Sequence, residues 1–297
     1  MNSLEDGHFP YWVRIHLPDG QSSGLRVVEK SNWAGDGALF SRSAYETVRE
    51  RQEFDFNRTG VYVLWETEDL GALPRVYIGE ADPLRPRLNQ HWAQKDFWTN
   101  AVAFAAKDHS LNKAHVRHLE AQLIQRARDL KRCKLENGNM PNAPSMSSAD
   151  KTQADAFFRD MLLCLPVLGI DFFEQPPPRP AQEPDLFLRV AEIRAEGYQS
   201  DSGFVVKAGS QARKSESHHI HPYMARLRTD LIDQGVLKDA GETFVFSIDY
   251  TFGPPRSGPS TVAGVILGRP ASGTTDWKDA AGRTLKELQE QSLQDDE

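Results

Sequence analysis

The sequence predicts an α+β protein in which an antiparallel hairpin is followed by helices and by a separate C-terminal domain. Residues 60–65 and 75–79 alternate as two strands do, and the polar loop between them favours an antiparallel pair. Residues 82–92 and 110–130 carry the start signals of helices. Residues 175–185 contain five prolines in eleven positions, which favours an extended spacer between domains.

These signals divide the chain into four segments. Residues 1–57 are expected to form a strand-rich N-terminal appendage, and residues 58–174 a domain that holds the hairpin and its helices. Residues 175–185 form the proline-rich linker. Residues 186–297 mix strand and helix signals and are expected to form a separate mixed α/β domain.

Composition excludes several classes of protein. With 297 residues, 39% hydrophobic and 26% charged, the chain is typical of a globular protein of about two domains. It has no apolar run of the roughly 18 residues that a membrane span needs and no secretory signal at its start. Two cysteines, Cys133 and Cys164, are too few for a disulfide framework. We therefore expect a cytoplasmic protein with no membrane partner.

Charge is distributed unevenly along the chain. The net charge is −7, but residues 75–134 contain twelve Lys and Arg against six Asp and Glu, a local balance of +6. A basic stretch inside an acidic chain is expected where a domain contacts phosphates. The alternative is that these basic residues only form the solvated end of a helix.

The two strands of the hairpin each carry a tyrosine. Strand alternation places Tyr62 and Leu64 on one face of the first strand, and Tyr77 can share that face from the second. Gly79 follows at a point where the backbone turns sharply or passes close to another group. The alternative for each tyrosine is an ordinary half-buried strand residue.

The helix after the hairpin brings two more polar groups to the strand ends. Asp82 is a candidate N-cap with Pro83 at the first helical position. Arg87 and His91 are four residues apart, so they lie on one face of this helix. That face is expected beside the tyrosines.

The second helix carries an acidic residue next to its apolar stripe. Ser110 is a candidate N-cap, and the stripe includes Leu119 and Leu123. Glu120 lies against this stripe, where a carboxylate is costly to desolvate unless a cation or a metal ion meets it. The alternative is a structural salt bridge to an arginine.

The order of these residues resembles the GIY-YIG nuclease family. The resemblance is carried by Gly60-Val61-Tyr62, Tyr77-Ile78-Gly79, Arg87, His91 and Glu120. It implies the GIY-YIG nuclease fold, a small antiparallel sheet flanked by helices. It also implies a nuclease site on one face and a single divalent ion held by Glu120.

The resemblance covers about residues 58–140, with two departures. Val61 stands in place of the family's isoleucine, and Pro86 stands where the family often has a basic residue. The family also has an asparagine beyond the glutamate. Asn137, Asn139 and Asn142 are the candidates, and Asn137 is preferred as the catalytic one.

The chain as a whole resembles bacterial GIY-YIG proteins with an added C-terminal domain of unknown function. Such a fusion implies that residues 186–297 target the protein to nucleic acid and do not add a second chemistry. Phage defence and repair are both settings that suit such an enzyme.

The chemistry of phosphodiester hydrolysis assigns expected roles to these side chains. Glu120 is expected to hold Mg²⁺ or Mn²⁺, and Arg87 to bind the phosphate through its planar fork. A free tyrosine is ionised about one part in a thousand at pH 7, so positive charge from Arg87 and the ion is expected to lower the pKa of Tyr62. The alternative is that His91, titrating near neutrality, accepts the proton. Tyr62 is expected to activate or orient the water, and Tyr77 to position the phosphate. The roles of the two tyrosines are interchangeable at this point.

We therefore expect a hydrolase, a divalent-metal-dependent endonuclease that acts on DNA, with RNA as an alternative substrate. Because one site per chain cuts one strand at a time, a homodimer is one expected arrangement. The alternative function is a catalytically inactive nucleic-acid-binding module on the same scaffold. A purely structural protein is disfavoured by the local charge of +6.

Overall fold

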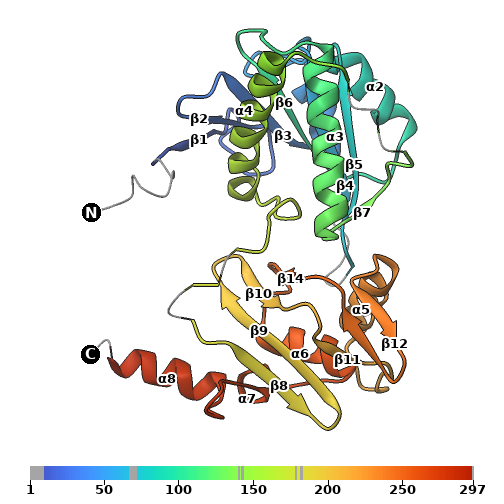
Figure 1. The fold of residues 1–297 in the computed structure, drawn as a ribbon. Coiled ribbons are helices and arrows are strands. Elements are labelled where there is room, and N and C mark those ends of the chain that lie inside the picture. The colour runs from blue at the N-terminus through green and yellow to red at the C-terminus, as the bar shows by residue number, and fades with distance from the viewer. Residues whose placement is uncertain are drawn as a thin grey trace. The chain divides into compact units, whose positions relative to one another are not determined.

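The structure of the protein is a computed structural model. It describes residues 10–66, 72–139, 141, 144–177, 179–180 and 183–295. It divides into two compact units (Figure 1). Unit 1 comprises residues 1–67 and 74–174, and unit 2 comprises residues 68–73 and 175–297. Within the described residues, no helix has both the length and the apolar character that a membrane span requires.

Unit 1 is built on a seven-stranded sheet with the order β1-β2-β3-β6-β4-β5-β7. Its strands are β1 (Val13–His16), β2 (Arg26–Lys30), β3 (Gly35–Ser41), β4 (Gly60–Glu66), β5 (Arg75–Ala81), β6 (Asn100–Ala106) and β7 (Lys134–Leu135). Its helices are η1 (Arg42–Ala44), α1 (Tyr45–Val48), α2 (Leu84–Gln94), α3 (Lys113–Leu130), α4 (Ser148–Cys164) and η2 (Pro166–Leu168). Neighbouring strands are antiparallel except for the short parallel pair of β5 and β7.

The strands between residues 13 and 41 belong to the same sheet as the hairpin. β3 pairs with β6 over its whole length, from Gly35 opposite Ala106 to Ser41 opposite Asn100. The sequence predicts a separate appendage for residues 1–57, but β3 lies inside the sheet. Strand alternation indicates which face of a strand is apolar and does not indicate its distant partner.

The sheet of unit 1 is covered on both faces, as Figure 1 shows for α3 and α4 on one of them. One core includes Val61 and Val63 of β4 together with Leu119 of α3. The other core includes Tyr62 and Leu64 of β4 together with residues of α1 and α2. The predicted alternation of the first tyrosine strand is therefore confirmed, and this strand is buried on both sides.

Unit 2 contains two antiparallel sheets. The five-stranded sheet has the order β14-β10-β9-β8-β15, and the three-stranded sheet has the order β11-β13-β12. The elements are β8 (Leu186–Val190), β9 (Ile193–Ser200), β10 (Gly203–Val206), β11 (Gln211–Arg213), α5 (Pro222–Asp233), β12 (Leu237–Ala240), β13 (Thr243–Phe246), β14 (Tyr250–Phe252), α6 (Pro259–Leu267), α7 (Gly273–Asp276), β15 (Trp277–Lys278) and α8 (Leu285–Asp295). Because its named strand pairs are antiparallel, unit 2 is α+β and not α/β.

The segment before β5 is part of the core of unit 2. Leu73 is 2% exposed and packs in a cluster with residues of α5 and α6. Its backbone N–H donates to Oδ2 of Asp230 at 2.7 Å. Arg256 donates to the backbone oxygen of Ala72 at 2.8 Å. These contacts fix Ala72 and Leu73 within unit 2.

Candidate functional site

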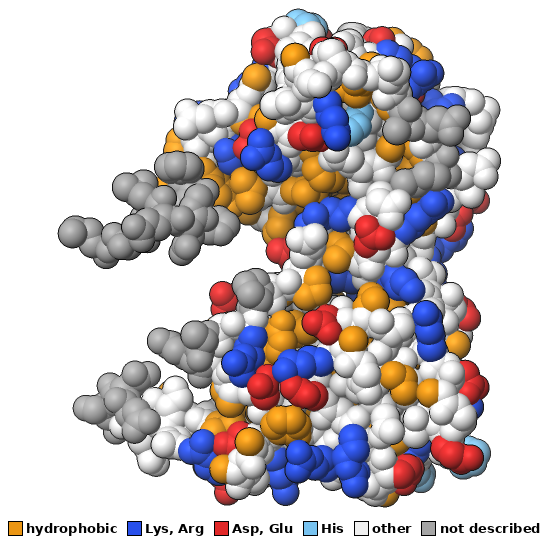
Figure 2. Space-filling view, in the orientation of Figure 1, with side chains coloured by type: hydrophobic (Ala, Val, Ile, Leu, Met, Phe, Trp, Pro, Cys, Tyr) orange, Lys and Arg blue, Asp and Glu red, His pale blue; other side chains and the backbone are white. Residues whose placement is uncertain are grey.

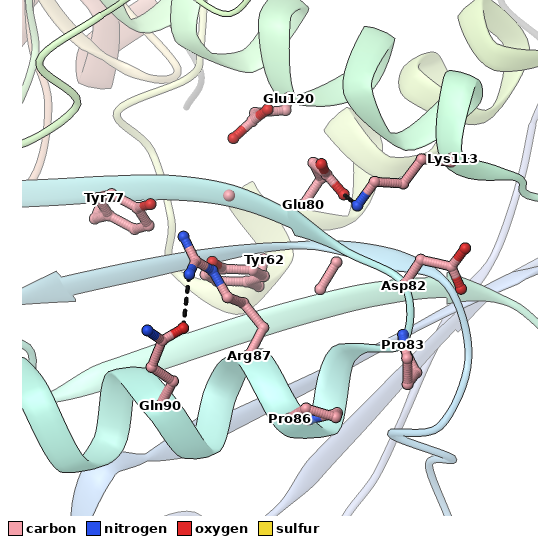
Figure 3. A pocket seen from close by; sticks show the side chains of 12 residues that line it. Tyr62, Tyr77, Glu80, Asp82, Pro83, Pro86, Arg87, Gln90, Lys113 and Glu120 are labelled. Carbon is pink, nitrogen blue, oxygen red and sulfur yellow. Dashed lines mark hydrogen bonds and ion pairs between the residues drawn. The ribbon is translucent and has the colours of Figure 1, made fainter.

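A polar pocket of about 540 Å³ lies beside the hairpin of β4 and β5 in unit 1. α2 and α3 contribute side chains to it from opposite sides of β5 (Figure 3). The polar side chains that line it are Tyr62, Tyr77, Glu80, Asp82, Arg87, Gln90, Lys113 and Glu120. Four of the predicted site residues therefore share one pocket.

The pocket forms where β5 is an open edge of the sheet. β7 pairs with β5 only at Arg75 and Val76. Beyond Val76, no other strand of the described residues lies on this side of β5. Side chains from both faces of the sheet can therefore line one pocket past Gly79, which has no side chain of its own. Figure 3 shows Arg87 and Glu120 reaching this pocket from opposite sides of β5.

The two tyrosines lie on the same face of the hairpin. The ring centroids of Tyr62 and Tyr77 are 6.3 Å apart. Gly79 is directly opposite Tyr62 in the antiparallel register. A Cβ atom on Gly79 would lie 2.3 Å from the hydroxyl oxygen of Tyr62, so only glycine leaves room for this phenol. The sequence prediction of a close approach at Gly79 is confirmed.

Replacement of Gly79 by alanine is expected to destabilise the protein by about 1–3 kcal/mol, because the new methyl group overlaps the buried phenol of Tyr62. Denaturant unfolding measures the loss. Gly138→Ala is the matched control, because no atom lies within 4 Å of a Cβ at that glycine. Equal midpoints for the two variants would contradict the predicted overlap.

Tyr62 is hydrogen-bonded to His91 in the interior behind the pocket. The hydroxyl oxygen of Tyr62 lies 2.7 Å from Nε2 of His91, and the two side chains are 0% and 4% exposed. Burial, with the positive charges of Arg87 and Lys95, lowers the pKa of His91 to about 4. The imidazole is therefore neutral at pH 7, and we assign the phenol as the donor to Nε2.

Burial also raises the pKa of Tyr62, and the nearby Arg87 guanidinium opposes this rise without reversing it. The expectation that His91 titrates near neutrality is therefore wrong, and Arg87 alone does not make Tyr62 more acidic than a free tyrosine. The reason in both cases is desolvation, which disfavours the charged form of each group. The effect of a bound ion on the pKa of Tyr62 stays a prediction.

Arg87 reaches the pocket from the second turn of α2. Pro83 and not Asp82 occupies the N-cap position, and the Asp82 carboxylate accepts a hydrogen bond from Thr59 at 2.7 Å. Pro86 lies in the first turn, where its missing N–H removes no hydrogen bond of the helix. The helix therefore begins one residue later than predicted.

The guanidinium of Arg87 is held by an uncharged partner. Its Nη1 donates to Oε1 of Gln90 at 2.7 Å (Figure 3). Within the described residues it forms no ion pair with a carboxylate. It also interacts with the phenol oxygens of Tyr62 and Tyr77, and its remaining donors are directed to the pocket, where a planar fork of this kind suits a phosphate group.

Glu120 reaches the pocket from α3. Asn112 and not Ser110 caps this helix, and its side chain accepts hydrogen bonds from the N–H groups of Ala114 and His115. The apolar face of α3, which includes Leu119, packs against the sheet, and Glu120 lies at the border of this face. The capping residue differs from the prediction, but the position of Glu120 beside the apolar stripe agrees with it.

The Glu120 carboxylate has no hydrogen-bond or ion-pair partner among the residues that the structure describes. Burial, together with the negative charge of Glu80, raises the pKa of Glu120 to about 7. The salt bridges that the sequence allows for Glu120 are instead formed by Glu80. Its carboxylate lies 2.7 Å from Nζ of Lys113 and 3.6 Å from Nε of Arg117.

An unpaired, partly buried carboxylate fits a divalent cation, because a bound positive charge would offset its desolvation. Glu120 is therefore the residue of this pocket that would hold such an ion. Across the described ranges, no three His, Cys, Asp or Glu side chains converge as a metal cluster. The remaining ligands would have to be water and substrate oxygens, which is usual for Mg²⁺.

The raised pKa of Glu120 predicts a pH-dependent stability. Its folded-state value of about 7 lies above the ~4.3 of an unfolded glutamate, so the folded protein binds the proton more tightly. This contribution is present at low pH and is lost as the pH rises to about 7. In chelator, we expect the Tm of Glu120→Gln to exceed that of the parent by a margin that grows from pH 5 to pH 7.5. A margin independent of pH would contradict the shifted pKa.

Asn137, predicted as catalytic, lies outside the pocket lining. Its side chain accepts from the N–H of Ile78 at 3.0 Å and donates to the oxygen of the same residue at 2.8 Å. It therefore continues the ladder of β5 where β7 ends. Asn139 is exposed, and Asn142 lies outside the described residues. The structure thus gives Asn137 a positioning role for β5.

Sequence reasoning did not find three polar residues of the pocket, Glu80, Gln90 and Lys113. Two signals were available. Gln90 follows Arg87 by three residues on one helix, so the two side chains are neighbours. Glu80 follows Val76 and Ile78 at two-residue intervals, so it lies on the same core-facing side of the strand. An acidic side chain at such a position requires a partner. The contact of Lys113 with Glu80 depends on tertiary packing.

The fold and the pocket define an α+β protein of two units, one of which carries a polar pocket with an unpaired carboxylate. Residues 186–289 match the family model of a domain of unknown function, DUF4357. This match lies within the C-terminal segment where the sequence predicts a domain of unknown function. It does not reach residues 58–140, so the resemblance to GIY-YIG nucleases stays a prediction. No curated protein and no solved structure matches the chain.

Proposed function

We propose that the protein is a divalent-metal-dependent endonuclease that hydrolyses phosphodiester bonds in DNA. The main support is the convergence of Tyr62, Tyr77, Arg87 and Glu120 on one pocket, although they come from two strands and two helices. These groups offer a phosphate-binding cation, hydrogen-bonding phenols and a metal-binding carboxylate. Phosphodiester hydrolysis requires an oriented or activated water and stabilisation of the charge on the phosphoryl and leaving oxygens, which these groups can supply.

Arg87 would bind the non-bridging oxygens of the scissile phosphate. Its guanidinium has no carboxylate partner among the described residues, and Gln90 holds it at the pocket. A guanidinium forms two parallel hydrogen bonds with a phosphate, which fixes the orientation of the substrate as well as its position. Arg87 would therefore stabilise the charge that develops on these oxygens in the transition state.

Tyr62 would orient the attacking water. Because its O–H donates to the neutral His91, its phenolic oxygen keeps two acceptor lone pairs, one for the Arg87 guanidinium and one for a water in the pocket. The raised pKa of Tyr62 argues against a free phenolate as the base. Tyr77 lies at the same pocket, partly exposed, and would contact the phosphate. His91 would act through Tyr62, which its 2.7 Å contact positions.

Glu120 would hold the divalent ion, Mg²⁺ or Mn²⁺, and an ion at this position supplies Lewis-acid stabilisation of the phosphoryl and leaving oxygens. The carboxylate must be deprotonated to bind it. Since the pKa of Glu120 is raised to about 7 without an ion, binding is expected to weaken below that pH.

The proposal is tested with the full chain and labelled single- and double-stranded DNA and RNA, each with Mg²⁺ and with chelator. Cleavage of DNA that needs the metal is the expected result. Binding without cleavage would overturn it and favour the catalytically inactive nucleic-acid-binding module. Cleavage of RNA alone would move the substrate class from DNA to RNA.

A further inference from the structure

The outer face of the β8–β9 hairpin in unit 2 carries two arginines side by side. Arg189 and Arg194 are directly opposite each other in the antiparallel register, and both are exposed. Directly opposite residues point to the same face of a sheet, so the two positive side chains are neighbours. The other face of the hairpin is core, with Leu188 and Ile193 fully buried.

These arginines have no acidic partners in the described part of the chain. Like charges at directly opposite positions destabilise a sheet, so a carboxylate is expected nearby. The nearest candidates are already paired, Glu196 with Lys207 and Glu192 with Arg213. Among the described residues, the guanidinium of Arg194 donates to the backbone oxygens of Ala191 and Ile193, and its backbone N–H donates to the Gln211 side chain. The two guanidinium groups therefore have no carboxylate partner among the described residues, and Glu196, which lines the same pocket, is neutralised by Lys207.

An aromatic ring lies beside the arginine pair. The guanidinium carbon of Arg189 lies 5.0 Å from the ring centroid of Phe187, a cation–π contact on the partly exposed face of the sheet. Phe187, Arg189 and Arg194 line a pocket of about 650 Å³ that also includes the turn at Gly209. Figure 2 shows basic, acidic and hydrophobic side chains next to one another over this part of unit 2.

We propose that this surface, Phe187 with Arg189 and Arg194, binds single-stranded nucleic acid. A base would stack on the guanidinium plane of Arg189, which Phe187 supports from below, and Arg194 would contact a backbone phosphate. A duplex keeps the faces of its bases stacked internally and cannot use the aromatic part of the surface. The concave shape and the unpaired positive charge together favour a strand with exposed bases.

The proposal does not depend on the nuclease activity, because binding is measured in chelator, where no metal-dependent cleavage occurs. The probe is a fluorescent single-stranded DNA of about 16 nucleotides, followed by anisotropy with the full chain. We expect Arg189→Gln with Arg194→Gln to weaken binding about tenfold or more and to lower the salt slope by about 0.7, since Arg194 makes the one phosphate contact. Phe187→Leu, which keeps the apolar contact and removes the ring, is expected to weaken it about fivefold or more.

The matched control is Arg226→Gln, which removes an exposed arginine from α5 of the same unit. Unchanged affinity in this variant, with losses in the other two, supports the proposal. Equal losses in the control would show that only overall charge matters and would overturn it. Equal binding of a duplex of the same sequence, or stronger competition by polyglutamate than by DNA, would also overturn it. Circular dichroism melts confirm that each variant is folded.

Discussion

Glu120→Gln is expected to lower the rate of DNA cleavage on the order of 10³-fold, because it removes the one unpaired carboxylate of the pocket that fits a divalent ion. Glutamine keeps the size of the side chain and loses its charge, so the pocket keeps its shape. Initial rates on labelled DNA in Mg²⁺ measure the effect. The parent should also gain thermal stability on addition of Mn²⁺, and the variant should not.

Glu136→Gln is the control for this experiment, because Glu136 is a carboxylate of the same unit that lies outside the pocket and pairs with Arg75 at 3.0 Å. Its rate should stay within about twofold of the parent, since a surface salt bridge contributes about 0–1 kcal/mol. Cleavage that survives in Glu120→Gln at the parental rate would remove this residue from the site.

Arg87→Ala is expected to reduce cleavage by about 10²–10³-fold, because it removes the cation that would bind the phosphate in the transition state. Arg87→Lys should recover only part of the activity, since an ammonium group cannot form the two parallel hydrogen bonds of a guanidinium. Single-turnover cleavage rates at saturating enzyme separate this effect from a change in affinity.

Arg85→Ala is a matched control on the same helix. Arg85 is two residues before Arg87 and donates to the Glu50 carboxylate at 3.1 Å, outside the pocket. Its loss should change cleavage little. If the two alanine variants lose activity equally, the positive charge of the helix matters and the specific position of Arg87 does not.

The parts of the site that sequence reasoning predicted depend on local periodicity. Alternation along one strand predicts that Tyr62 points to the opposite face of the sheet from Val61 and Val63. The structure buries Tyr62 in one core and the two valines in the other. A spacing of four residues placed Arg87 and His91 on one helical face, and both lie near Tyr62. Such patterns hold because strand and helix geometry repeat regardless of the rest of the fold.

The predictions that were wrong concern features that depend on contacts between residues far apart in the sequence or on local packing. Ser110 and Asn112 are both good caps, and the choice depends on which side chain reaches the free N–H groups of the first turn. The family resemblance favours Asn137 as a catalytic residue, but the open edge of β5 offers its amide a backbone partner at Ile78. The pKa of His91 depends on burial by several elements, which no spacing in the sequence reports.

The assignment of residues 68–73 to unit 2 affects how the protein can be dissected. A fragment that ends at residue 174 would lack the apolar cluster that buries Leu73. It would also lack the Asp230 carboxylate that accepts the hydrogen bond from the Leu73 N–H. Leu73 would then be exposed just before β5, and its N–H would have lost its carboxylate acceptor. Conversely, an isolated fragment of residues 175–297 would lack Leu73 and would leave part of its apolar core uncovered. The two halves are thus better studied by point substitution than by scission.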